Sequence, residues 1–223
     1  MRKDLTEVVF ILDRSGSMSG LEADTIGGFN SMIQKQQKED GEAYISAVLF
    51  DDQTEVLYDR TPVGKVKPMT DKQYYVRGCT ALLDAIGGAI HHISKIHKSE
   101  AEEDRPEKTL FIITTDGMEN ASHTYDYKKV KKMVEKRKEK NGWEFLFLGA
   151  NIDAIGEATK FGISADRAVN YECDSEGTAI NFRSLSNTVS AVRHAKSRAE
   201  IGMAMDLGCA PIREDYAKRH KKS

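Results

Sequence analysis

The stretch VVFILDRSGSM, residues 8–18, decides the fold class of this 223-residue chain. Its first five residues are apolar and mostly β-branched, which is typical of a short strand buried on both faces. Asp13 and the polar residues after it end the strand, and Gly16 permits a sharp turn. A helical pattern follows and ends before Gly41. A buried strand leading into a helix predicts an α/β protein with a parallel sheet.

The same alternation of strand and helix continues along the chain. The runs at residues 44–50 and 54–58 are close enough to form a hairpin, so we expect one antiparallel edge strand. The predicted fold is therefore α/β and doubly wound, with a mostly parallel central sheet and helices on both faces. Further strands are expected over residues 109–115, 143–148 and 168–171, and helices over residues 82–96, 125–140, 152–161 and 182–198.

Length and charge limit the classes of protein to consider. The charged fraction is 30%, but the signs nearly cancel at a formal net charge of -2, which does not favour binding to nucleic acid or to an anionic membrane. A chain of this length fits one α/β domain better than two. We expect that domain over residues 1–200, followed by a C-terminal extension or tail over residues 201–223 that is frayed from Arg219 onward.

The N-terminus and the cysteines predict the compartment. The chain runs from Met1 directly into the first strand without an apolar signal segment, and no stretch approaches the roughly 20 apolar residues of a membrane span. Cys79, Cys173 and Cys209 are widely spaced and lack C-x-x-C spacing, which argues against disulfides and against a zinc knuckle. These features predict a cytoplasmic protein, with Cys79 as a packing residue.

Polar residues gather where the expected strands end, which is where ligands bind in such sheets. Asp13, Ser15 and Ser17 follow the first strand, Asp116 follows the strand over 109–115, and Thr80 precedes the helix over 82–96. Two carboxylates and three hydroxyls are hard oxygen donors that suit Mg²⁺ or Mn²⁺ better than Zn²⁺. Because the hydroxyls are neutral, the bound cation would still attract one more anionic oxygen, such as the Glu or Asp carboxylate of another protein.

The same residues resemble a known family. The D-x-S-x-S run from Asp13 to Ser17, Thr80, and Asp116 before Gly117 are similar to the metal-ion-dependent adhesion site of von Willebrand factor A domains. The resemblance covers roughly residues 5–200 and implies an intact site. Ser15, Ser17 and Thr80 would bind the cation directly, and Asp13 and Asp116 directly or through water. Small soluble bacterial and phage members, some associated with tellurite resistance, are most similar through Thr-Asp-Gly-x-Glu-Asn at residues 115–120.

Together these features predict a metal-dependent protein-binding module and not an enzyme. The alternative is an Mg²⁺-dependent phosphohydrolase or phosphotransferase, since parallel sheets with an Asp after the first strand also serve that chemistry. Ser15 stands where haloacid-dehalogenase enzymes need a second Asp, and no lysine or general base is placed at a later strand end. A third reading is a structural subunit that does not use the site. The partner and the oligomeric state are not specified.

Several residues near this set have two readings. Glu119 and Asn120 follow Asp116 and would either orient the site or form a turn. Asp84 lies one helical turn after Thr80 and would either buttress the site or act on the helix dipole. His91, His92 and His97 lie on or near one helix, but His92 and His97 lack the spacing of a zinc pair.

Overall fold

The apolar run at residues 8–12 forms the centre of strand β1, Arg2–Asp13, in a computed structural model that describes residues 1–221. β1 pairs in parallel with β2, Glu42–Phe50, on one side and with β4, Pro106–Thr115, on the other. Its side chains are buried from Leu5 onward. A central strand covered on both faces has no solvent side, which explains why its sequence does not alternate.

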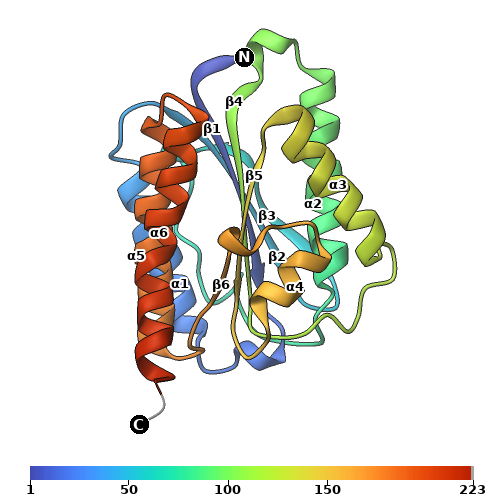
Figure 1. Ribbon diagram of the computed structural model, residues 1–223, viewed down its shortest axis with the longest axis vertical. Helices are drawn as coiled ribbons and strands as arrows, with labels where there is room; N and C mark the ends of the chain where they lie inside the picture. The colour runs from blue at the N-terminus through green and yellow to red at the C-terminus, as the bar shows by residue number, and fades with distance from the viewer. Residues whose placement is uncertain (222–223) are drawn as a thin grey trace.

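The described residues form one six-stranded sheet in the order β3-β2-β1-β4-β5-β6 (Figure 1). β3, Thr54–Pro62, pairs antiparallel with β2, whereas β5, Glu144–Gly149, and β6, Ala168–Asn170, are parallel to their neighbours. The predicted mostly parallel sheet with one antiparallel edge strand is confirmed. β3 is longer than expected because it continues past a bulge, where Arg60 has a φ of 45°.

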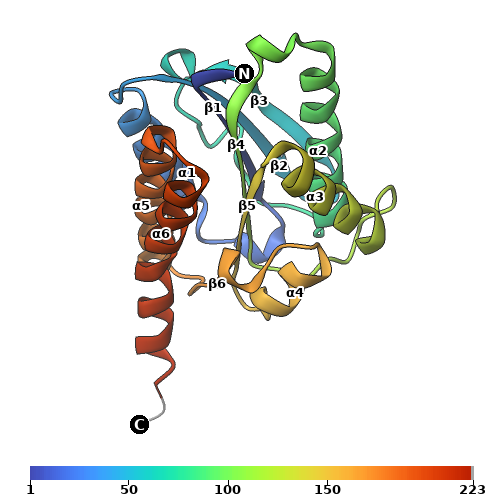
Figure 2. The ribbon, with the colours of Figure 1, turned by 45° about the horizontal axis from the view of Figure 1, so that its top comes forward.

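Six α-helices in the described part of the chain cover the two faces of the sheet (Figures 1 and 2). One layer contains α1, α5 and α6, and the other contains α2, α3 and α4. Successive β1 residues supply the two cores in turn: Val8 and Phe10 face the first layer, and Val9 and Ile11 face the second. The helices span Glu22–Gln36 (α1), Leu82–Ser99 (α2), Tyr127–Asn141 (α3), Ala154–Lys160 (α4), Ser175–His194 (α5) and Arg198–Arg219 (α6).

The C-terminal helices differ from the sequence prediction. One helix was expected over residues 182–198, but α5 begins earlier, where Asp174 accepts a hydrogen bond from the Gly177 N–H at 2.7 Å. The boundary expected at residue 200 falls inside α6, which begins after its N-cap Ser197. α6 packs against α5 and its buried Met205 belongs to the same core as β1, so this segment is no detached tail as far as residue 219. Residues 222–223 of the expected tail lie outside the described residues.

Glycines let two helices approach their neighbours closely. A Cβ atom on Gly28 of α1 would lie 2.3 Å from Cδ2 of Phe182 in α5. A Cβ atom on Gly87 of α2 would lie 2.4 Å from the ring of Tyr125. Both distances are shorter than van der Waals contact, so these positions require glycine although it lowers helix propensity.

Candidate metal site

Three segments meet at the edge of the sheet where the parallel strands end. β1 and β4 are neighbours in register, with Leu12 opposite Thr114, so the residues after them, Asp13 and Asp116, come to the same edge. The segment before α2 reaches this edge as well, because the Gly16 N–H donates to the Gly78 carbonyl at 3.2 Å. The fold thus gathers residues that lie about 100 positions apart in the chain.

The hydroxyl side chains lie close to the second carboxylate. Ser17 Oγ donates to Asp116 Oδ1 at 2.6 Å, and the hydroxyls of Ser15 and Ser17 are 3.1 Å apart. A Cβ atom on Gly117 would lie 3.0 Å from Thr80 Oγ1 and 3.3 Å from Ser17 Oγ. The hydroxyls of Ser17 and Thr80 therefore both lie beside Gly117, directly after Asp116. This position also explains why a residue without a side chain follows the aspartate.

Asp13 organises the loop from its inner side. Its Oδ1 accepts from the Ser15 N–H at 2.7 Å, and its Oδ2 accepts from Thr115 Oγ1 at 2.5 Å. Its carbonyl oxygen accepts from the Tyr74 hydroxyl at 2.5 Å. Each carboxylate oxygen thus has one protein donor and keeps a further lone pair, so Asp13 can reach a cation directly or through a water molecule.

Negative charge at this edge is costly without a cation. Asp13 and Asp116 are each 2% exposed. Burial raises the pKa of Asp13 to about 6; hydrogen bonds from Thr115 and Ser15 oppose this shift, and the charge of Asp116 adds to it. Burial also raises the pKa of Asp116, against a hydrogen bond from Ser17. Two crowded carboxylates beside neutral hydroxyl oxygens form a donor set that fits a hard divalent cation, and the exposed Ser17 opens it to solvent.

Arg14 points away from this donor set, as alternation along the loop requires. Its buried guanidinium bonds Asp51 through Nε at 2.8 Å and Glu55 through Nη1 at 2.7 Å. Arg77 also donates to Asp51, at 2.9 Å. Burial alone would raise the pKa of Asp51, but the hydrogen bonds from Arg77 and Arg14 lower it. The network ties the loop after β1 to the β2–β3 turn and to the segment before Thr80.

The contacts of the residues after Asp116 support both readings, since Glu119 also accepts the N–H groups of the turn at residues 121–122. Asn120 Oδ1 accepts from the Thr80 N–H at 2.9 Å, and the Asn120 N–H donates to the Thr80 carbonyl at 3.0 Å. Glu119 accepts a backbone N–H from the first turn of α2 at 2.8 Å. Asp84 in turn accepts backbone N–H groups of residues 123–125. All three side chains join the loop after β4 to the start of α2, and Asn120 positions Thr80 directly.

Cys173 belongs to this edge, although nothing in the cysteine spacing indicates it. Its Sγ donates to Asp116 Oδ2 at 3.5 Å, so both oxygens of that carboxylate have a partner. Burial, with the charge of Asp116, raises the pKa of the Cys173 thiol to about 12. Cys173 follows β6, and the rule that ligands bind at strand ends, applied to that short strand, would have found it. The prediction for Cys79 is wrong, because that side chain is exposed and is not packed.

Comparison with known proteins shows which fold the chain has. No family model and no curated protein matches the chain. Solved structures do: proximal thread matrix protein 1 from the mussel byssus (TM-score 0.53, 16% identity, 82% of this chain and 45% of that chain) and a mutant PilB minor pilin from Streptococcus sanguinis (0.60, 11%, 86% and 63%). The vWF domain of the type V pili tip protein Mfa5 from Porphyromonas gingivalis matches over 86% of this chain and 97% of its own (0.58, 10%). The chain has the von Willebrand factor A fold.

The likeness concerns the fold alone, since all these identities are low. The chain spans less than two thirds of the length of the mussel and streptococcal proteins. No helix within residues 1–221 has the length and apolar character needed to cross a bilayer. Nor do those residues bring three or more His, Cys, Asp or Glu side chains together as a metal cluster. The candidate site differs from such a cluster because three of its five donors are hydroxyls.

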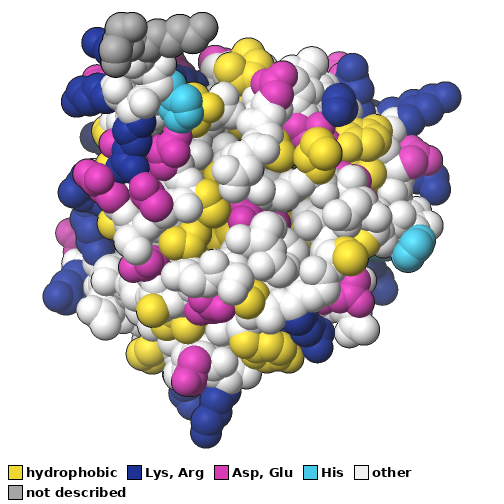
Figure 3. All heavy atoms as spheres, turned by 90° about the horizontal axis from the view of Figure 1, so that it is seen from below, with side chains coloured by type: hydrophobic (Ala, Val, Ile, Leu, Met, Phe, Trp, Pro, Cys, Tyr) yellow, Lys and Arg dark blue, Asp and Glu magenta, His cyan; other side chains and the backbone are white. Residues whose placement is uncertain are grey.

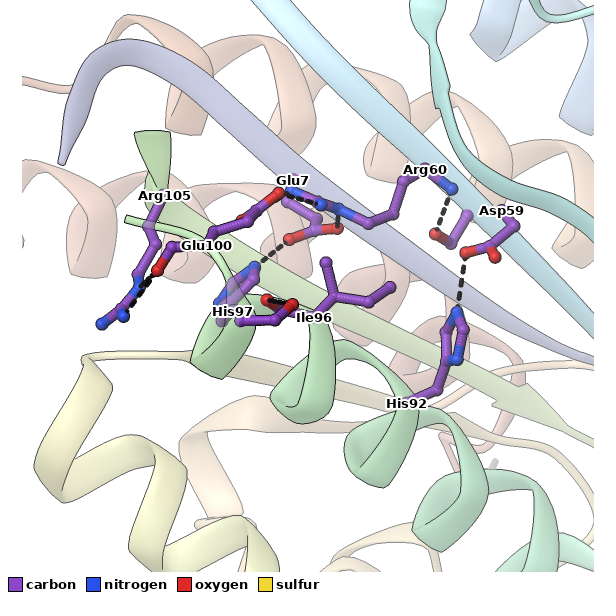
Figure 4. Close-up of polar contacts among 10 residues, drawn as sticks. Glu7, Asp59, Arg60, His92, Ile96, His97, Glu100 and Arg105 are labelled. Atoms are coloured by element: carbon purple, nitrogen blue, oxygen red, sulfur yellow. Dashed lines mark hydrogen bonds and ion pairs between the residues drawn. The ribbon is translucent and has the colours of Figure 1, made fainter. Parts of the chain in front are cut away.

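Two histidines of α2, His92 and His97, contact acidic side chains away from this edge (Figure 4). His97 Nε2 lies 2.5 Å from Oε2 of Glu7, a fully buried residue of β1. Arg60 Nε donates to the other Glu7 oxygen at 2.6 Å. His92 contacts Asp59 at 2.8 Å. These contacts give the two histidines separate acidic partners, and Glu7 is neutralised inside the fold by Arg60.

Proposed function

We propose that this chain is a divalent-cation-dependent protein-binding module that grips an acidic residue of a partner protein. The convergence of hydroxyl and carboxylate oxygens from three segments at one sheet edge carries the proposal. Ser15, Ser17 and Thr80 would bind the cation directly, and Asp13 and Asp116 directly or through water. The bound cation supplies positive charge for a partner's carboxylate.

The donor set guides the choice of cation. All five side chains offer oxygen, and oxygen-rich sites suit Mg²⁺ or Mn²⁺ better than Zn²⁺. A structure of the mussel byssus protein has a zinc-occupied adhesion motif (TM-score 0.53, 13% identity, 83% of this chain and 46% of that chain). That neighbour supports a divalent metal at this place in the fold. For the present chain we propose Mg²⁺ or Mn²⁺ as the resident ion.

The surface around the site explains why a carboxylate would need the cation. Figure 3 shows the molecule from below in the orientation of Figure 1, the end at which the parallel strands finish, and most Lys and Arg side chains lie toward its margin. Arg14, the basic residue inside the loop, is fully buried and paired with Asp51. A partner's Glu or Asp would therefore find its positive charge in the cation itself. The cytoplasmic location and the likeness to small bacterial and phage members remain predictions from the sequence.

The alternative, a phosphohydrolase, is less compatible with the geometry. A nucleophilic Asp13 would have to reach an incoming phosphate, whereas this residue is only 2% exposed. The Arg14 guanidinium, which could have bound a phosphate, is directed to Asp51 and Glu55. Cation-dependent hydrolysis of para-nitrophenyl phosphate that disappears in Asp13→Asn would favour the enzyme over the binding module.

Two measurements on the full chain test the proposal. The first titrates Mn²⁺ into chelator-stripped protein and follows free Mn²⁺ by electron paramagnetic resonance. We expect stoichiometric binding by the wild type, loss in Asp116→Ala, and retention in Asp126→Ala, which alters an exposed helix cap after the same strand. The second adds acetate as a small carboxylate and measures relaxation of its methyl protons by bound Mn²⁺. Absence of Mn²⁺ binding by the wild type contradicts the metal site, and binding without acetate relaxation contradicts carboxylate capture.

A further inference from the structure

A small cavity lies behind the loop over residues 13–18, between the sheet and the helices α1 and α5. Its volume is about 20 Å³. Asp13 and Tyr74 line it on the side of the loop, Thr25 lines it from α1, and Thr178 and Asn181 line it from α5. The cavity therefore touches three segments that the fold has to hold together at this edge.

Three polar side chains of the cavity lack a protein partner. Thr25, Thr178 and Asn181 are each 4% exposed. Among the described residues, Oγ1 of both threonines and Oδ1 of the asparagine have no hydrogen-bond partner. Buried polar groups in folded proteins are almost always hydrogen-bonded, so three buried oxygen atoms without a partner around one cavity require a common explanation.

The helix backbone does not supply the missing partners. A buried threonine in a helix can donate to the carbonyl four residues earlier. Thr188, further along α5, does so with the Ser184 carbonyl at 2.9 Å. Thr25 and Thr178 make no such bond and line the cavity instead. Their orientation is what a polar ligand in the cavity would produce.

We infer that one water molecule is bound in this cavity as a fixed part of the fold. A water needs about 10–15 Å³ and two to four polar partners, and the cavity meets both conditions. The water would accept from the hydroxyls of Thr25 and Thr178 and donate to Asn181 Oδ1. Tyr74 also lines the cavity, and its hydroxyl donates to the Asp13 carbonyl and lies beside Thr25.

Water fits this cavity better than a cation does. The oxygens without a partner around the cavity belong to Thr25, Thr178 and Asn181 and carry no charge, whereas a cation there would need anionic ligands. The water joins α1 to α5 beside Tyr74, whose hydroxyl donates to the carbonyl of Asp13 at the start of the loop over residues 13–18. The inference concerns the fold behind the loop and is independent of whether a divalent cation binds in front of it.

The test is a high-resolution crystal structure of the full chain, with a matched pair of variants. We expect an electron-density peak within hydrogen-bonding distance of Thr25, Thr178 and Asn181. The double variant Thr25→Val/Thr178→Val keeps the cavity volume but removes two partners, and should lose the peak. Thr188→Val removes a buried hydroxyl of the same helix outside the cavity and should retain it.

Oxygen-17 relaxation dispersion in solution provides a second readout. The number of long-lived waters should fall by one in the double variant and stay unchanged in Thr188→Val. The inference is overturned if the wild-type crystal has no peak in the cavity, if the double variant keeps the water count of the wild type, or if a rubidium soak puts an anomalous peak there. The absence of a density peak in the wild-type crystal is sufficient to overturn the inference, so the test does not depend on the folding of the double variant.

Discussion

Replacing Asp13 by Asn should stabilise the cation-free protein at alkaline pH and abolish its response to divalent cations. The loop can accept the amide with the same two hydrogen-bond partners, Ser15 and Thr115. The Asn oxygen takes the Ser15 N–H, and the Asn N–H₂ donates to Thr115 Oγ1. The Thr115 proton is then redirected to the Gly117 carbonyl, which is already 3.2 Å away.

The magnitude follows from the pKa of Asp13. Burial raises this pKa from 3.8 to about 6, so the folded state binds the proton more tightly than the unfolded chain does. The resulting stabilisation is fully present below about pH 4 and is lost as the pH rises through 6. Above that pH the ionised carboxylate costs the cation-free fold at most about 3 kcal/mol, since a tenfold difference in proton affinity corresponds to about 1.4 kcal/mol. For a chain of this size that is roughly 6–12 °C in melting temperature.

The assay is urea and thermal unfolding at pH 5 and pH 8, in chelator and in Mg²⁺. In chelator, Asp13→Asn should exceed the wild type at pH 8, and this advantage should shrink at pH 5. The wild type should gain about 2.7 kcal/mol from Mg²⁺ at a hundredfold excess over its dissociation constant, and the variant should gain little. Asp4→Asn, at an exposed position of the same strand, is the control. An advantage that does not depend on pH, or an equal Mg²⁺ response in both proteins, would refute the reasoning.

Two further predictions concern packing and the thiol at the site. Gly28→Ala should destabilise the fold by about 1–3 kcal/mol, because its Cβ would overlap Phe182, whereas Gly27→Ala meets open space and should gain up to about 1 kcal/mol in urea unfolding. Equal effects of the two alanines would contradict the close approach of α1 and α5. Cys173→Ala removes a hydrogen bond to Asp116 and should weaken Mn²⁺ binding about tenfold, whereas Cys173→Ser should retain most of the affinity. Indistinguishable Mn²⁺ titrations of the two variants would show that the thiol does not orient the carboxylate.

The strand and helix pattern was readable in the sequence because burial on both faces leaves a strong local signal. The continuous apolar run of β1 and the periodic apolar residues of α2 each predict their own element. The order of elements predicts the parallel sheet, and the rule that ligands bind at strand ends indicates Asp13, Ser15, Ser17, Thr80 and Asp116 as candidates. Helix limits were less accurate where caps decide them, as at Asp174 and Ser197.

The sequence by itself determined the type of the elements from β1 to α5, because that depends on local apolar patterns, and the chemistry of the donors, because that depends on the residue types. Only the tertiary structure decided which hydrogen bonds these donors make. Asp13 accepts from the Ser15 N–H, and Ser17 donates to Asp116. Cys173, 57 residues further along the chain, donates to the same carboxylate of Asp116. It also decided that the segment expected as an extension or tail becomes a packed helix, because α6 has little amphipathic pattern of its own and is buried where it meets α5 and β6. Contacts between distant segments depend on strand order and register, which no local pattern encodes.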